Sequence, residues 1–199
     1  VIIVRYADDY VLGFQHRHEA ERFLADLNAR LNRFGLSLHP EKTRLIEFGR
    51  FATENRRKRG QGKPETFDFL GFTHMCGKTR IRKWFIVRRK TIKKRLRAAL
   101  KRVKTILYSR MHNPVHEVGE WLQRVVWGYY KYHAVPGNME AMTAFRNDIV
   151  RYWYKVLRRR GQKRRINWEV FGPIVKRWIP GPKVMHPHPN ERFYAKHPR

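Results

Sequence analysis

The sequence has few acidic residues, a single cysteine and no long apolar run. Sixteen Asp and Glu stand against 45 Lys and Arg, which gives a formal charge of +29. Self-repulsion on this scale is tolerated where a polyanion is the usual partner, so nucleic acid is the leading candidate and an anionic membrane surface is the alternative. Cys76, as the one cysteine, cannot form an internal disulfide. No stretch approaches the roughly 20 apolar residues of a membrane-spanning helix.

These shortages predict a protein of a reducing compartment. No signal-peptide pattern is present in the sequence, so we expect a cytoplasmic protein of bacterial type or an organellar one, not a secreted one. The chain is also not a disordered basic tail, because such tails are poor in aromatic residues. Six Trp, nine Tyr and twelve Phe predict a packed core, and aromatic rings of this kind are also surfaces on which bases stack.

The first fourteen residues are the stretch around which the rest can be organised. Two short apolar runs, residues 1–6 and 10–14, flank Ala7, Asp8 and Asp9. Strand-like runs separated by turn-forming residues predict a β-hairpin, here with two carboxylates at its tip and buried flanks. Asp is a common turn residue in its own right. The other interpretation is a divalent-metal site, because Mg²⁺ takes one or two carboxylates from a protein and fills its shell with water and phosphate.

The rest of the N-terminal half predicts an α+β layer. Apolar residues at three- and four-residue steps predict a helix over residues 16–34, and residues 36–38 and 44–48 read as short strands. A basic, glycine-containing stretch at 50–66 predicts a flexible loop that becomes ordered on phosphates through Arg56, Arg57, Lys58 and Arg59. Alternating aromatic residues at 67–72 and the apolar run at 84–87 predict a second hairpin.

From Arg88 the sequence predicts basic helices. Residues 88–110, 115–133 and 138–160 carry apolar stripes at helical spacing and have short connections, which is typical of a small antiparallel bundle. The first of these segments holds eleven Lys or Arg and no acid. A solvated charged face is one reading; phosphate contacts are the other. The cations that we expect to bind nucleic acid here are Lys93, Lys94, Arg97 and Lys101, followed by Arg158, Arg159, Arg160, Lys163, Arg164 and Arg165.

Three blocks of the N-terminal half resemble reverse transcriptases. Tyr6-Ala7-Asp8-Asp9 resembles the YxDD box, which implies that Asp8 is a metal ligand and that Asp9 lies beside it. Residues 35–43 resemble the next block, which implies that Lys42 lies near the leaving pyrophosphate; the alternative is an exposed lysine in a proline turn. Residues 67–72 resemble the primer grip, here Phe69, Leu70 and Gly71, although by itself this segment is an ordinary hydrophobic strand.

The helical half resembles the thumb and maturase-specific domain of group II intron-encoded reverse transcriptases. The resemblance rests on Asn113-Pro114-Val115, on residues 127–132, on the helix from Tyr152 to Arg160 and on residues 186–193. The implied fold is α+β, a partial palm followed by a helical bundle. The implied domains are the C-terminal part of the palm at 1–87, the thumb and maturase region at 88–179, and a proline-rich basic tail at 180–199.

The resemblance implies RNA-directed DNA synthesis with two Mg²⁺ ions. The implied partners are group II intron RNA, whose splicing the protein would assist, a template–primer duplex, a DNA target and dNTP, with no membrane. A third metal-binding carboxylate would precede Val1, so we expect a C-terminal fragment that does not extend a primer alone. A non-enzymatic RNA-binding splicing factor is the alternative. A ribosomal-type basic protein would need neither the acidic hairpin nor so many aromatic residues.

Overall fold

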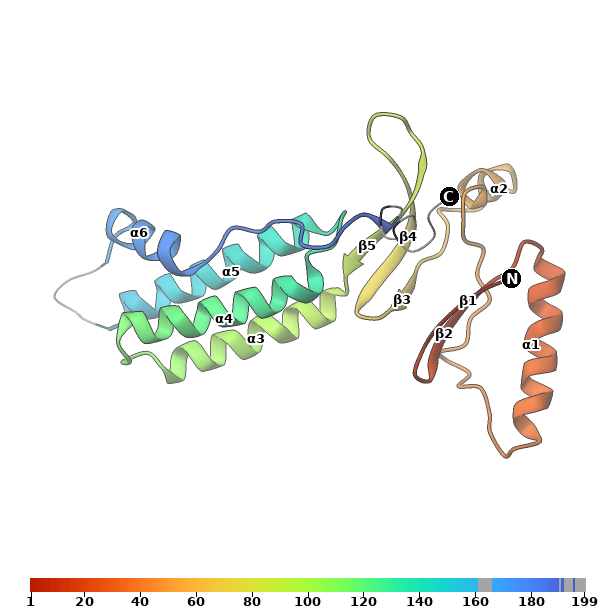
Figure 1. Ribbon diagram of the computed structural model, residues 1–199, viewed down its shortest axis with the longest axis horizontal. Coiled ribbons are helices and arrows are strands. Elements are labelled where there is room, and N and C mark those ends of the chain that lie inside the picture. Colours follow the sequence, from red (N-terminus) through yellow and green to blue (C-terminus); the bar gives the residue numbers. More distant parts are fainter. Residues whose placement is uncertain (161–165, 190, 192–194, 196–199) are drawn as a thin grey trace. The chain divides into compact units, whose positions relative to one another are not determined.

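The computed structural model describes residues 1–160, 166–189, 191 and 195 of the chain. The chain divides into two compact units, Val1–Glu65 and Thr66–Arg199, and each unit is described by itself. The architecture is mixed, with two small antiparallel sheets and six helices in the described ranges (Figure 1). This agrees with the predicted α+β class. Among the described residues, no helix combines the length and the apolar character needed to cross a membrane.

The first unit opens with the predicted hairpin. Strand β1 (Ile2–Tyr6) pairs with β2 (Asp9–Gly13) in an antiparallel register that sets Tyr6 opposite Asp9. Helix α1 (Arg17–Asn32) follows, and the rings of Phe14 and Phe23 lie 5.3 Å apart, which joins the end of the hairpin to the helix. The predicted hairpin and the predicted helix are both confirmed, with the ends moved by one or two residues.

Three expectations for the first unit were wrong. The first flank of the hairpin, β1, is exposed rather than buried, with Ile2 71% and Ile3 67% accessible, whereas Val11 and Leu12 of the second flank are half-buried. Residues 36–38 and 44–48 are not strands, since a strand needs a hydrogen-bonded neighbour and the described chain offers them none. The expected loop at 50–66 contains a helix, α2 (Ala52–Lys58).

The second unit begins with a three-stranded antiparallel sheet in the order β3-β4-β5. The strands are β3 (Phe67–Phe69), β4 (Phe72–Lys78) and β5 (Phe85–Thr91). Residues 67–69 and 85–87 are strands as predicted, but the predicted pairing between them was wrong. Residues 67–72 contain the turn between β3 and β4, and β5 pairs with β4 instead. β5 continues through residues 88–90, which were expected to be helical, because it pairs with β4 along its whole length. Pairing along a ladder outweighs the helix propensity of three basic residues.

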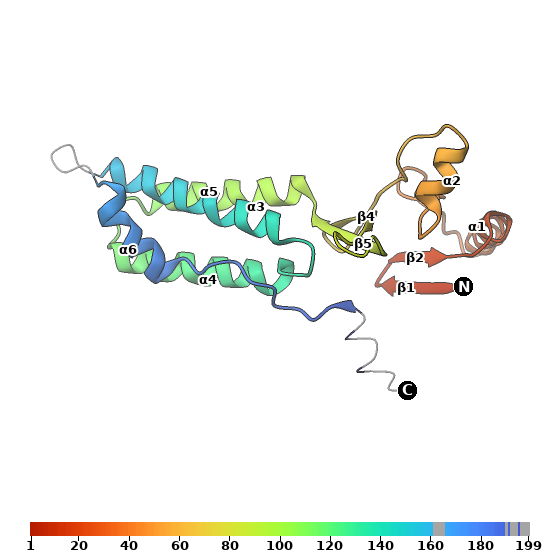
Figure 2. The ribbon, with the colours of Figure 1, turned by 90° about the horizontal axis from the view of Figure 1, so that it is seen from above.

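The predicted helical bundle is confirmed. Helices α3 (Lys93–Ser109), α4 (Val115–His133) and α5 (Met139–Arg158) lie alongside one another, and α6 (Trp168–Trp178) packs on the bundle (Figures 1 and 2). Their inward faces form one core, whose fully buried side chains include Leu107, Leu122, Tyr130, Met142, Phe145, Ile149, Trp153 and Phe171. Each such side chain stabilises the fold by about 1.5–3 kcal/mol through burial.

The proline-rich segment after α6 is packed on the bundle. The carbonyl oxygen of Pro180 accepts hydrogen bonds from Tyr130 Oη at 3.3 Å and from Arg146 Nε at 3.2 Å. Further on, the Met185 N–H donates to the Ala134 carbonyl at 2.9 Å. The segment therefore runs back along the helices toward the end of α4 (Figure 1).

The contact between α4 and α6 depends on a glycine. A Cβ on Gly119 would lie 2.5 Å from Cγ of Trp178, which is too close for any real contact. We expect Gly119→Ala to displace Trp178 and to lower the free energy of unfolding by about 1–3 kcal/mol. Gly128 lies on the same helix with open space around it. Gly128→Ala should therefore raise stability by up to about 1 kcal/mol through helix propensity. Urea unfolding of the two variants measures this, and equal effects would contradict the packing argument.

Candidate active site and nucleic-acid interface

The two adjacent carboxylates lie at the turn of the first hairpin. Ala7 and Asp8 form a two-residue turn, and Asp9 is the first residue of β2. Ala7 has a φ of +53°, in the left-handed region that costs a non-glycine residue about 1 kcal/mol. Positive φ at this position is typical of the turns that match the twist of a hairpin. The Arg5 Nε donates to the Ala7 carbonyl at 2.9 Å and so holds the turn.

Both carboxylates are available to a ligand. Asp8 and Asp9 are exposed, and among the residues that the structure describes neither forms an ion pair, since Arg5 bonds to a carbonyl oxygen instead. Exposed, unpaired carboxylate oxygens are the donors that Mg²⁺ prefers, and one or two are a usual protein contribution. No group of three or more potential ligands occurs in the described ranges. Asp8 and Asp9 thus have the chemistry of two metal ligands, but by themselves they do not make a complete metal site.

Lys42 lies in a separate turn of the same unit. Its N–H donates to the His39 carbonyl at 3.1 Å, which closes the proline-containing turn. The side chain is exposed and forms no ion pair with the residues described. No hydrogen bond or ion pair joins it to Asp8 or Asp9 in that part of the chain.

The cations at residues 56–59 are largely neutralised by nearby acids. Lys58 Nζ lies 3.1 Å from Glu54, and Arg59 forms an ion pair with Glu47. Arg56 donates to the Gly62 carbonyl at 3.1 Å and lies 4.0 Å from Glu65. The stretch is thus ordered by contacts within the protein, contrary to the expectation that only phosphates would order it. Arg57, which is exposed, has no such ion pair in the described chain.

The turn expected to resemble a primer grip is clamped on the bundle. Leu70 and Gly71 have φ values of +47° and +80°, and they connect the cross-strand pair Phe69 and Phe72. Tyr132 Oη donates to the Leu70 carbonyl at 2.9 Å, and the Ile92 N–H donates to the Gly71 carbonyl at 3.2 Å. Both turn carbonyls are therefore held by elements of the helical region.

Aromatic packing strengthens the clamp. The ring of Phe72 stacks on Tyr132 with 5.8 Å between centroids and meets His133 edge-on at 5.4 Å. A Cβ on Gly71 would lie 3.1 Å from Arg95 Nη1 and 3.4 Å from Tyr132 Cε1. Glycine at this position is required both by its positive φ and by the close approach of these side chains.

A buried polar network below the turn was missed by the sequence reasoning. Asn138 Nδ2 donates to Thr91 Oγ1 and to the His133 carbonyl, each at 2.8 Å, while its Oδ1 accepts from the Thr91 N–H at 2.9 Å. Asn138 is 1% accessible. One side chain thus joins the end of β5 to the end of α4. Burial lowers the pKa of His133 to about 4, with a smaller contribution from the positive charge of Arg95.

The cations of α3 differ from those at 56–59 because no acid accompanies them. Lys93, Lys94, Arg97 and Lys101 are all exposed, and no ion pair involves them within the described residues. Lys93, Arg97 and Lys101 follow at four-residue steps on one face, where like charges repel. The first turn of α3 has no acidic residue, so cations also lie at the positive end of the helix dipole. Binding of a polyanion would reduce both the repulsion between these cations and their unfavourable interaction with the helix dipole.

The arginines at the end of α5 are partly structural. Arg158 lies over the ring of Tyr154 at 5.7 Å, and Arg159 lies over Tyr108 at 5.5 Å. The Arg160 Nη2 donates to the Asn113 carbonyl at 2.6 Å, and burial lowers the pKa of its guanidinium. Arg160 therefore fastens the end of α5 to the α3–α4 connection. The expected cations Lys163, Arg164 and Arg165 lie outside the described residues.

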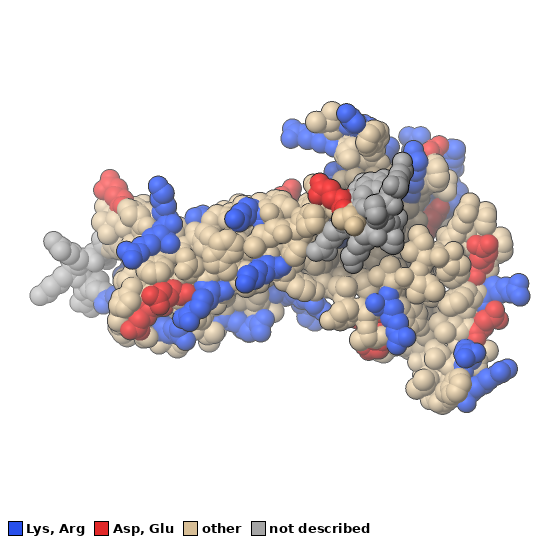
Figure 3. All heavy atoms as spheres, in the orientation of Figure 1, with Lys and Arg blue, Asp and Glu red and all other residues tan. Residues whose placement is uncertain are grey.

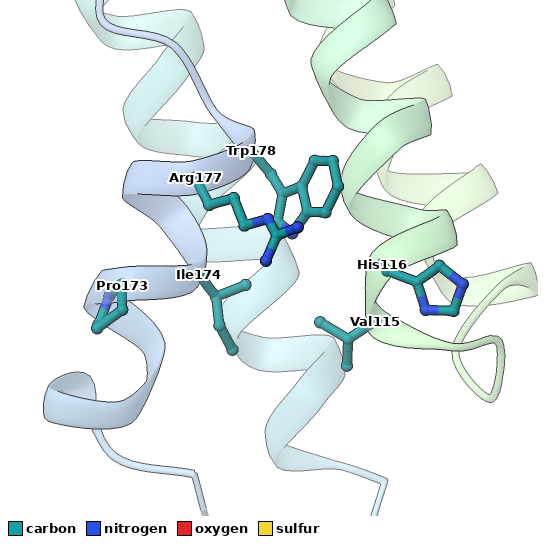
Figure 4. Close-up of a pocket in the computed structure, with 6 residues that line it drawn as sticks. All are labelled: Val115, His116, Pro173, Ile174, Arg177 and Trp178. Atoms are coloured by element: carbon teal, nitrogen blue, oxygen red, sulfur yellow. The ribbon is translucent and has the colours of Figure 1, made fainter.

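An open groove lies between α4 and α6. It has a volume of about 430 Å³ and is lined by Val115, His116, Pro173, Ile174, Arg177 and Trp178 (Figure 4). The Arg177 guanidinium lies 4.9 Å from the centre of the Trp178 ring. The groove is a contact surface between two helices, and none of the expected site residues lines it.

Residues 1–74 match the family model described as reverse transcriptase (RNA-dependent DNA polymerase). The matched segment contains the carboxylate turn, Lys42 and the Phe69–Phe72 turn. No curated protein matches the chain. This part of the chain is therefore similar to RNA-directed DNA polymerases, in agreement with the resemblance of the YADD segment.

The burial of His133 predicts a pH dependence. The unfolded chain binds a proton on this side chain near pH 6.5, whereas the folded chain does so only near pH 4. The free energy of unfolding should therefore fall as the pH is lowered from about 6.5 to about 4. Below pH 4, His133 should cause no further change.

Chemical unfolding across this pH range measures the effect. His133→Gln should show a shallower fall than the natural chain, whereas His116→Gln, which replaces an exposed histidine, should show the same fall. Identical pH profiles for all three chains would contradict the assignment.

Proposed function

We propose that the chain is the catalytic-turn and duplex-binding part of an RNA-directed DNA polymerase of the group II intron type. The observation that carries the proposal is the pair of exposed, unpaired carboxylates, Asp8 and Asp9, at a hairpin turn inside the segment that matches reverse transcriptases. The reaction is the attack of a primer 3′-OH on the α-phosphate of a dNTP, with pyrophosphate as the leaving group.

The residues of this chain have distinct roles in that reaction. Asp8 would hold magnesium and Asp9 would support it. When bound, the metal would supply Lewis-acid stabilisation of the negative charge that develops on the phosphate oxygens. Lys42 neutralises charge on the leaving pyrophosphate or gives it a proton. Phe69, Leu70 and Gly71 position the primer end, and the clamp by Tyr132 and Ile92 makes that turn rigid.

The helical unit binds the duplex and the intron RNA. The unaccompanied cations of α3 suit the evenly spaced phosphates of a helix, which gives affinity and register without sequence readout. Arg158 and Arg159 add cations at the end of α5, and Lys163, Arg164 and Arg165 follow them in the sequence. By holding the folded intron RNA, the same surface would assist splicing.

The role of Asp8 is tested in an active RNA-directed DNA polymerase that contains this sequence. Asp8→Asn keeps the shape of the side chain but removes the charge that binds metal, so RNA-templated incorporation of dNTP should fall by at least about 100-fold. Binding of intron RNA should not change. Asp26→Asn, which neutralises an exposed acid on α1, is the matched control and should keep full activity. A parallel loss of RNA binding in Asp8→Asn would show a structural carboxylate instead.

The role of α3 is tested with the 199-residue chain itself. Replacing Lys93, Arg97 and Lys101 by Ala should weaken binding to an RNA–DNA heteroduplex. It should also reduce the slope of log affinity against log salt by about 3, close to one unit for each lost phosphate contact. The control replaces Arg22, Arg30 and Arg33 of the α1 region by Ala and removes the same net charge. Equal losses in the two variants would mean that net charge, and not this face, binds the duplex.

A further inference from the structure

The loop between β4 and β5 carries exposed apolar side chains among cations. Strand pairing ends with Lys78 opposite Phe85, so the loop comprises residues 79–84. Ile81 is 89% accessible and Trp84 is 62% accessible. Lys78, Arg80, Arg82 and Lys83 are exposed beside them, and residues 78–90 contain no acid. The hairpin projects away from the helices of its unit (Figures 1 and 3).

The loop is held in one conformation. The Thr79 N–H donates to the Trp84 carbonyl at 2.7 Å, and the Trp84 N–H donates to Thr79 Oγ1 at 2.9 Å. Lys83 has a φ of +55°, a conformation that persists in a non-glycine residue only where its surroundings fix it. Arg88 Nη2 donates to the Lys78 carbonyl at 2.9 Å and braces the base of the loop. The backbone at Trp84 is therefore held by contacts within the hairpin itself.

The side-chain chemistry points to an unpaired nucleobase. The Arg82 guanidinium lies 4.9 Å from the centre of the Trp84 ring, and stacked indole and guanidinium groups are the surfaces on which bases stack. The surrounding cations would contact the phosphates on either side. Bases inside a duplex are already stacked, so an aromatic ring at a projecting tip gains this contact mainly where a strand is unpaired.

We propose that the β4–β5 loop is a stacking site for single-stranded nucleic acid, with Trp84 and Arg82 contacting a base and Lys78, Arg80 and Lys83 its phosphates. β4 has seven residues, so its two ends, six steps of about 3.3 Å apart, are separated by about 20 Å. The loop would thus hold an unpaired strand at that distance from the Phe69–Phe72 turn. This deepens the proposed function and rests on it for the identity of the partner as a polynucleotide.

The test compares single-stranded and duplex probes with the whole 199-residue chain. A labelled 20-nucleotide RNA, the DNA of the same sequence and a blunt RNA–DNA heteroduplex are titrated with the natural chain and with Trp84→Leu. Loss of one base stack should weaken binding of both single strands by about tenfold or more, because every base has a π-face. Heteroduplex affinity and the salt slope should not change, since no charge is removed.

Two further variants make the result specific. Trp84→Phe keeps an aromatic ring and should restore most of the single-strand affinity. Phe51→Leu removes another exposed ring, 63% accessible and covered by Arg50 at 5.7 Å, and should bind as the natural chain does. Unchanged heteroduplex binding and circular dichroism show that Trp84→Leu is folded.

Several results would overturn the proposal. These are an unchanged single-strand affinity in Trp84→Leu, an equal loss on single strands and heteroduplex, or no binding of single strands by the natural chain. Binding to phosphatidylserine-containing vesicles that depends on Trp84, without an effect on single strands, would assign the loop to a membrane surface instead. None of these outcomes alters the α3 test of duplex binding, so the two proposals fail separately.

Discussion

Unbalanced positive charge on α3 is the constraint on which the rest of the account depends. Its exposed cations repel one another and oppose the dipole at the start of the helix, and no acid of the described chain forms an ion pair with them. Burial of apolar side chains in the core that α3 forms with α4 and α5 offsets the free-energy cost of this repulsion. The cations at residues 56–59 contrast with it, because Glu47, Glu54 and Glu65 accompany them. Among the described residues, acids therefore accompany most of the cations at 56–59, whereas none pairs with the cations of α3.

The same bundle fixes the Phe69–Phe72 turn. Tyr132 and Ile92 hold its carbonyls, and Asn138 joins the following strand to the end of α4. The turn, the end of β5 and the start of α3 therefore form one packed region. A positioning element gains accuracy from such support, since its geometry is set by a buried core and not by a flexible loop. By contrast, the carboxylate turn has only the Arg5 hydrogen bond and its own strand pairing in the described structure.

The sequence predicted those helices and strands that are determined by residues close together in the chain. The bounds of α4 follow from apolar periodicity between Pro114 and Pro136. The first hairpin follows from two apolar runs around Asp8. The end of β5 was not predictable in this way, because residues 88–90 become a strand only through pairing with β4. Nor were the ion pairs of Arg59 and Arg44, whose partners Glu47 and Glu65 lie 12 and 21 residues away, or the bonds of Asn138 to Thr91.

Lysine footprinting of the 199-residue chain tests the central claim most directly. The chain is acetylated with and without an RNA–DNA heteroduplex at low salt, and each lysine is quantified by mass spectrometry. The account predicts strong protection of Lys93, Lys94 and Lys101 by the duplex. It also predicts little change at Lys58, whose charge is already met by Glu54. Unprotected α3 lysines, or equal protection of Lys58, would contradict the claim that α3 is the face that binds the duplex.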